Sequence, residues 1–74
     1  MKFRKPVKAI IKTIDGIIKE ILVEVDELSK SDTMMLGTKM YMVTSVSKSQ
    51  IKLEEFVPFG EIIPIIGKEI NGRN

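Results

Sequence analysis

Carboxylates are the side chains of this 74-residue sequence that come closest to a catalytic arrangement. Two pairs are adjacent, Asp26-Glu27 and Glu54-Glu55, and paired carboxylates can act as general acid and base. In an extended strand, neighbouring side chains point to opposite faces, so Glu54 and Glu55 would not share one site. The chain has no His and no Cys, which excludes nucleophilic catalysis based on these residues and the usual zinc sites. We therefore expect no enzyme and assign no catalytic, metal-binding or cofactor-binding residue.

Basic residues at the start of the chain offer a binding chemistry instead. Residues 1–14 contain five basic side chains and no acidic one, although the net charge of the whole chain is only +2. Cations interleaved with an aromatic ring can hold phosphates and stack a base. The candidate nucleic-acid contacts are Lys2, Phe3, Arg4, Lys5 and Lys8. The competing interpretation is a solvated basic arm over residues 1–5, followed by charges that pair with the acidic residues of the next segment.

Apolar side chains offer a second binding chemistry. Methionine is flexible and polarisable and suits adaptable protein-binding surfaces, although it also fills cores. Four of the five methionines lie between residues 34 and 42, and an isoleucine-rich segment follows at residues 62–66. An exposed edge strand in that segment would pair with a strand of another chain. The candidate protein-interface residues are Met34, Met35, Met40, Met42, Ile62, Ile63 and Ile65.

The dipeptide Asp15-Gly16 decides which element positions the basic residues. An amphipathic helix over residues 7–30 agrees with apolar residues spaced three and four apart, but it would carry Gly16 in its interior. Asp-Gly between apolar segments is a strong hairpin signal. A three-residue loop from Ile14 to Gly16, with Gly16 left-handed, places odd-numbered residues opposite odd-numbered ones and separates apolar from charged faces. We predict a hairpin over residues 6–26 and keep the helix as the alternative.

Shorter elements are predicted in the rest of the chain. Residues 34–36 are predicted as a helical turn ended by Gly37, and residues 39–57 as a second hairpin with an even-length turn. The apolar residues expected to share one face of that hairpin are Met40, Met42, Val46, Ile51, Leu53 and Val57. Residues 57–60 predict a β-turn. Because Pro64 lacks a backbone donor, residues 61–67 are predicted as an edge strand, and residues 71–74 as a loose tail.

Together these elements predict a single domain over residues 1–74 with a mainly β fold. We expect a small barrel or a curled five-stranded antiparallel sheet, built from two hairpins and a C-terminal edge segment. The alternative is an α+β fold in which a helix over residues 7–30 lies on a small sheet. A chain of this length with neither disulfide nor metal needs a dense core or association with another chain.

These features lead to an expectation about function and location. We expect a small non-enzymatic binding or assembly module that acts through protein–protein contacts, including contacts between its own copies. The alternative is a nucleic-acid-binding β domain that uses the basic arm. No apolar run approaches the roughly 20 residues that span a bilayer, and no signal peptide is recognised. We therefore expect a cytoplasmic protein with no membrane contact.

Overall fold

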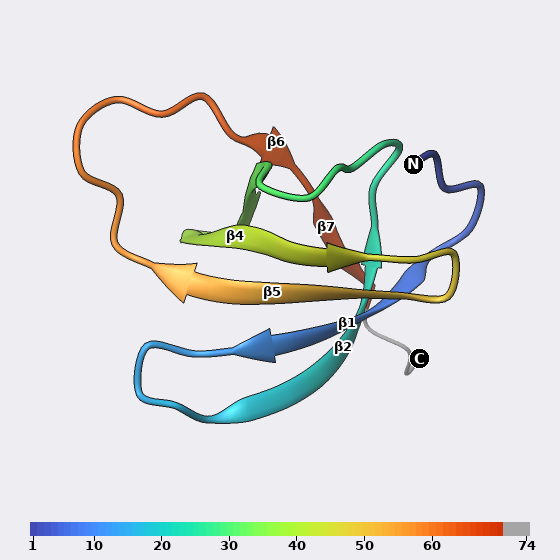
Figure 1. Ribbon diagram of the computed structural model, residues 1–74, viewed down its shortest axis with the longest axis horizontal. Coiled ribbons are helices and arrows are strands. Elements are labelled where there is room, and N and C mark those ends of the chain that lie inside the picture. Colours follow the sequence, from blue (N-terminus) through green and yellow to red (C-terminus); the bar gives the residue numbers. More distant parts are fainter. Residues whose placement is uncertain (71–74) are drawn as a thin grey trace.

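The computed structural model of the chain describes residues 1–70, in which all regular elements are strands (Figure 1). The strands are β1 (Val7–Lys12), β2 (Ile18–Glu24), β3 (Thr33–Leu36), β4 (Lys39–Val46), β5 (Gln50–Phe56), β6 (Ile65–Ile66) and β7 (Lys68–Ile70). The mainly β prediction is confirmed, and the alternative with a helix over residues 7–30 is wrong. The five-strand description is also wrong, because β3 occupies the predicted helical turn and two short strands take the place of the predicted edge strand. The tail predicted at residues 71–74 lies outside the described residues.

The first hairpin has the predicted register. Strands β1 and β2 pair antiparallel with Val7 opposite Val23, so that odd-numbered residues face odd-numbered ones. Gly16 ends the loop with a φ of 87°, in the left-handed region that glycine adopts without a steric cost. Its amide donates to the carbonyl oxygen of Thr13 at 2.9 Å. The hairpin consequently presents one dry face to the rest of the chain.

A β-bulge between Val43 and Ser45 changes which residues of the second hairpin face the core. Tyr41 and Val43 lie in the core, whereas Met42, which was predicted for the inner face, is exposed. Val57 is also outside the core, because it follows the last residue of β5. The predicted face is wrong on the far side of the bulge, since strict alternation counted from the turn does not include an extra residue.

The sheet closes almost completely on itself, as Figure 1 shows. The strand order is β6-β3-β4-β5-β1-β2-β7, so β6 and β7 lie at its two edges while only Gly67 separates them in the chain. Strand β6 pairs in parallel with β3, and β7 pairs antiparallel with β2. Strands β1 and β5 are also parallel, which corrects the prediction of a purely antiparallel sheet. The result is a small, nearly closed barrel, and only Ile65 and Ile66 of the edge strand predicted at residues 61–67 are a strand at the edge of the sheet.

One hydrophobic core fills the barrel, and strands β1 to β5 all contribute to it. Its buried members are Val7, Ala9, Ile11, Val23, Val25, Leu28, Met34, Leu36, Tyr41, Val43, Ile51 and Leu53. Met40 is buried as well but lies outside this cluster. A second apolar layer therefore exists on the outside of the barrel.

The N-terminal segment is held against the barrel by its backbone. Met1 and Leu28 exchange two hydrogen bonds, from the Leu28 amide at 2.9 Å and from the Met1 amino group at 2.7 Å. The Phe3 amide donates to the carbonyl oxygen of Asp26 at 2.8 Å, and the Phe3 ring packs against the core. The predicted basic arm is therefore a fixed part of one end of the barrel.

Replacing Gly16 with alanine is expected to lower the free energy of unfolding by about 1–2 kcal/mol. The space around an added Cβ is empty, so the cost arises from the left-handed φ alone. Asparagine tolerates this conformation better than alanine, so Gly16→Asn should be the less destabilised variant. Urea denaturation of the three proteins measures the order, and an alanine variant as stable as the parent would contradict the loop conformation.

Gly67→Ala is expected to destabilise the barrel by a different mechanism. A Cβ at position 67 would overlap the Met34 sulfur and lie 2.9 Å from Leu36 Cδ2, and overpacking of this kind costs about 1–3 kcal/mol. Because the overlap is mainly with Met34, Met34→Ala should destabilise the Gly67→Ala protein less than it destabilises the parent. A double-mutant cycle by chemical unfolding measures this coupling. Strictly additive costs would show that the two side chains do not compete for the same space.

Candidate functional site

A row of apolar side chains crosses the outer face of four strands. Met35 of β3 lies between Ile66 of β6 and Met40 of β4, and Met40 lies opposite Phe56 of β5. Side chains alternate along a strand, so these four residues face away from the core that their neighbours fill. The solvent face of a sheet is ordinarily polar. An apolar row in this position therefore needs either a cover or a partner.

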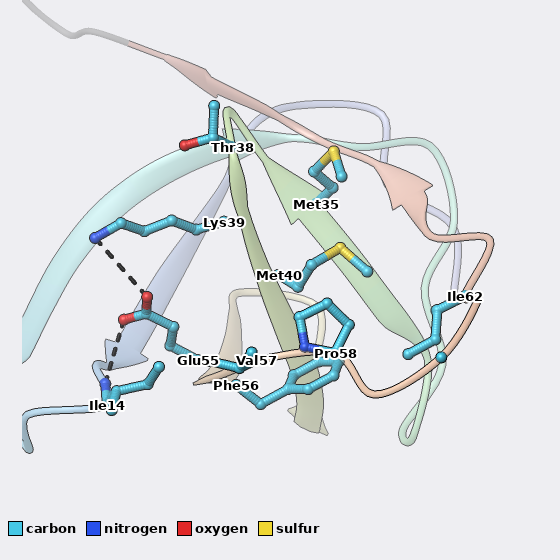
Figure 2. Close-up of a pocket in the computed structure, with 11 residues that line it drawn as sticks. Ile14, Met35, Thr38, Lys39, Met40, Glu55, Phe56, Val57, Pro58 and Ile62 are labelled. Carbon is cyan, nitrogen blue, oxygen red and sulfur yellow. Dashed lines mark hydrogen bonds and ion pairs between the residues drawn. The ribbon is translucent and has the colours of Figure 1, made fainter.

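The connection between β5 and β6, residues 57–64, covers part of this row. Met40 is only 7% exposed although it faces outward, and Figure 2 shows Pro58 and Ile62 beside it. The cover is incomplete, because an open groove of about 440 Å³ remains between the connection and the strands. The apolar residues that line this groove are Ile14, Met35, Met40, Phe56, Val57, Pro58 and Ile62.

One end of the groove is polar and joins three segments of the chain. Glu55 Oε1 accepts a hydrogen bond from the backbone amide of Ile14 at 3.2 Å, and Glu55 Oε2 lies 3.8 Å from Lys39 Nζ (Figure 2). The Glu55 side chain is mostly buried, whereas the Lys39 side chain remains exposed. These contacts fix the β1–β2 loop against the β4–β5 hairpin and place an ion pair, with its lysine exposed, at the rim of the groove.

The 57–64 connection also carries apolar side chains that nothing in the described chain covers. Phe59 is 99% exposed, Ile63 is 98% exposed and Val57 is 76% exposed. Burial of one such side chain is worth about 1.5–3 kcal/mol, so the isolated chain forgoes this stabilisation. Pro58 and Pro64 restrict the backbone of the connection. Exposed apolar clusters of this kind mark interaction sites, and we call the groove together with Val57, Phe59 and Ile63 the apolar patch.

The structure brings several of the predicted interface residues together. Those at the groove or on the connection beside it are Met35, Met40, Ile62 and Ile63. Met42 is exposed on the same outer face of β4 as Met40. Two predictions need correction: Met34 is fully buried in the core, and Ile65 packs against the core from its edge. Met34 is consequently not available to a partner in this fold.

Sequence reasoning missed the two most informative positions, Val57 and Phe59. The pattern of residues 57–60 predicts a tight turn, and a turn with Pro and Gly needs no special role. The available signal is composition, because residues 56–66 contain a single charged residue, Glu61. Connections at a protein surface are usually polar, so this low polarity indicates a segment with a binding or packing role.

The predicted nucleic-acid residues lie at the opposite end of the barrel. Strands β1 and β5 run parallel, so the segments that precede them, residues 1–6 and 47–49, meet at one end. Lys48 thereby joins the basic residues of the N-terminal segment. The charged residues around the resulting hollow, which measures about 480 Å³, are Lys2, Arg4, Lys5 and Lys48. We call this site the basic hollow.

Two of the predicted nucleic-acid contacts are engaged elsewhere. Phe3 borders the basic hollow, but its side chain is partly buried against the core, which reduces the ring area available for base stacking. Lys8 lies on the outer face of β1 and forms a surface ion pair with Glu20, with Nζ 3.5 Å from Oε2. The binding chemistry that remains at this end is therefore mainly cationic, without a fully exposed aromatic ring.

Within residues 1–70, no three acidic side chains gather where they could hold a metal ion. The same part of the chain has no helix of sufficient length and hydropathy to cross a membrane. Comparison of the sequence with protein-family models, with curated proteins and with solved structures finds no match.

The free energy of unfolding is expected to fall as the pH rises above about 10, and Tyr41→Phe should reduce that fall. Burial, followed by the negative charges of Glu55 and Glu69, raises the pKa of the Tyr41 hydroxyl. Above the ordinary pKa of tyrosine the unfolded chain has lost this proton while the folded chain keeps it. The contribution of Tyr41 to stability is therefore fully present below that pKa and is lost at higher pH. Urea denaturation at neutral and alkaline pH measures the effect, and an equal fall in both proteins would contradict this assignment.

Proposed function

We propose that this chain is a small assembly module, without catalytic activity, in which two copies associate through the apolar patch. The observation that carries the proposal is the nearly complete exposure of Phe59 and Ile63 beside a groove of the same apolar character. A protein of this size buries only a small apolar core, so its stability is marginal. Burying these side chains against a second copy recovers hydrophobic stabilisation that the single chain lacks.

Self-association is favoured because the patch contains both a projection and a recess. Phe59 projects from the 57–64 connection, and the groove lies between that same connection and the strands. A twofold dimer needs one self-complementary surface on each copy. Insertion of Phe59 of each copy into the groove of the other meets this requirement with a single surface.

Charge at the edge of the patch supports the same arrangement. Glu61 is exposed on the connection, and Lys39, which also pairs with Glu55 of its own chain, is exposed at the rim of the groove. In a reciprocal exchange, the connection of one copy brings Glu61 toward the groove rim of the other copy. The two copies therefore meet with opposite charges at the border of an apolar contact, as complementary interfaces do.

Addition of a strand at residues 62–66 is not part of the proposal. Strand β6 has two residues and is already paired with β3, while the chain continues directly into β7. We propose contact between side-chain surfaces instead. We also propose a cytoplasmic location, because a chain without Cys has no need of an oxidising compartment in order to fold.

Sedimentation of the full chain from about 1 μM to about 1 mM is expected to show a monomer–dimer equilibrium. The double variant Phe59→Ser/Ile63→Ser should weaken dimerisation by at least about 100-fold, because each copy loses two apolar side chains worth about 1.5–3 kcal/mol apiece when buried. Both residues are exposed in the monomer, so the variant should keep its circular dichroism spectrum.

Leu22→Ser is the matched control. Leu22 is an exposed apolar residue of β2 that does not line the groove, so its replacement removes surface hydrophobicity without touching the patch. Dimerisation of this variant should equal that of the parent. A parent protein that stays monomeric at every concentration, or equal weakening by Leu22→Ser, would exclude assembly through the apolar patch.

A further inference from the structure

The basic hollow combines two segments that are far apart in sequence. Lys2, Arg4 and Lys5 come from the N-terminal segment, and Lys48 comes from the turn between β4 and β5. No acidic residue of the described chain lines the hollow. Within residues 1–70, none of the four cations has a carboxylate within ion-pair distance. The fold therefore gathers positive charge at one place without a direct ion pair, and Glu27 lies opposite Lys2 in an isolated antiparallel bridge beside it.

The hollow is built from backbone that is already fixed. Hydrogen bonds from Met1 and Phe3 to Leu28 and Asp26 hold the N-terminal segment along the barrel. On the other side, the Ser47 hydroxyl donates to the Gln50 carbonyl oxygen at 2.9 Å and closes the turn that carries Lys48. A ligand that binds here needs to order only the ends of the basic side chains, which lowers the entropic cost of binding.

Phosphate is the ligand chemistry that such a site recognises. Lysine acts as a mobile point charge toward phosphate, and the arginine guanidinium can donate two parallel hydrogen bonds to one phosphate group. Four cations around one hollow carry more positive charge than is required to neutralise a single phosphate group. A polymer that presents several phosphates at a regular spacing would engage them together.

We infer that the basic hollow binds the phosphate backbone of double-stranded nucleic acid without reading its sequence. Single strands are held largely by stacking of bases on aromatic side chains. Phe3 lines the hollow but is partly buried against the core, Tyr41 is buried, and Phe56 and Phe59 belong to the opposite end of the barrel. A duplex keeps its bases stacked internally and offers its phosphates on the outside, which matches a mainly cationic site without a fully exposed aromatic ring.

Salt dependence gives this inference a quantitative expectation. Neutralising four phosphates of a duplex gives a slope of log K against log salt of about −3.6. Affinity should therefore fall about 150-fold when the salt concentration is raised from about 50 to about 200 mM. Fluorescence anisotropy of a labelled duplex of mixed sequence, titrated with the full chain, measures both the affinity and the slope.

Two double variants separate the hollow from general charge attraction. Arg4→Gln/Lys48→Gln removes one cation from each segment and should reduce the slope by about 1.8, to a fall of about 12-fold over the same salt range. Lys12→Gln/Lys19→Gln lowers the net charge equally, but at exposed positions near the β1–β2 loop at the opposite end of the barrel. This control should bind the duplex with the slope of the parent. All four residues are exposed, and circular dichroism checks that both variants fold.

The inference stands if the loss is confined to the Arg4/Lys48 variant. It is overturned if the parent does not bind duplex at low salt, or if both variants lose affinity equally. Tighter binding to single strands of the same sequence would also overturn it, as would tighter binding to vesicles of anionic phospholipid. Because the site is remote from the apolar patch, the loss expected for the Arg4/Lys48 variant relative to its control does not require the chain to dimerise.

Discussion

The two edges of the sheet meet through one residue that has no side chain. The amide of Gly67 donates to the Met35 carbonyl oxygen at 3.0 Å, while Met34 and Leu36 occupy the space that a Cβ would need. This close approach keeps β6 on β3 and lets the chain continue at once as β7 along β2. A short β protein without disulfides has to protect its strand edges in some other way. This junction keeps the sheet curled into a barrel. The curled sheet in turn encloses the core, separates the two ends of the barrel and positions the 57–64 connection.

Closure gives the barrel two ends of different chemistry. The parallel pair β1 and β5 starts beside the basic hollow and finishes beside the apolar patch. Partners of the two sites therefore do not compete for the same surface. In the proposed dimer, the apolar ends face each other and each copy retains its own basic hollow. Two linked weak sites bind a polymer with more avidity than either site alone.

The parts of this fold that sequence predicts are those with local causes. Gly16 predicts the first hairpin, because the residues next to it in the sequence are enough to specify a three-residue loop with a left-handed glycine. The bulge after Val43 carries no such signature, and neither does the parallel pairing of strands distant in the chain. Composition also cannot separate Met34, which is in the core, from Met35, which is at the groove, because a one-residue change of register exchanges their faces. Phe59 was hidden by a turn pattern that says nothing about what the side chain meets, and residues 57–60 show only a bend at Gly60 in place of the predicted β-turn.

The pairing of β1 with β5 sets the order in which the chain can fold. A parallel pair between distant segments forms only after the intervening loop entropy has been overcome, so the barrel belongs to the slow class of small domains. Residues 65–70 complete the ring, and without them β2 and β3 would present open edges. During synthesis these edges remain unprotected until the final strands emerge from the ribosome. A chain interrupted before Gly67 would retain all the buried residues of the core cluster but would lack β7 to pair with β2. The C-terminal strands therefore protect the sheet against aggregation through its edges.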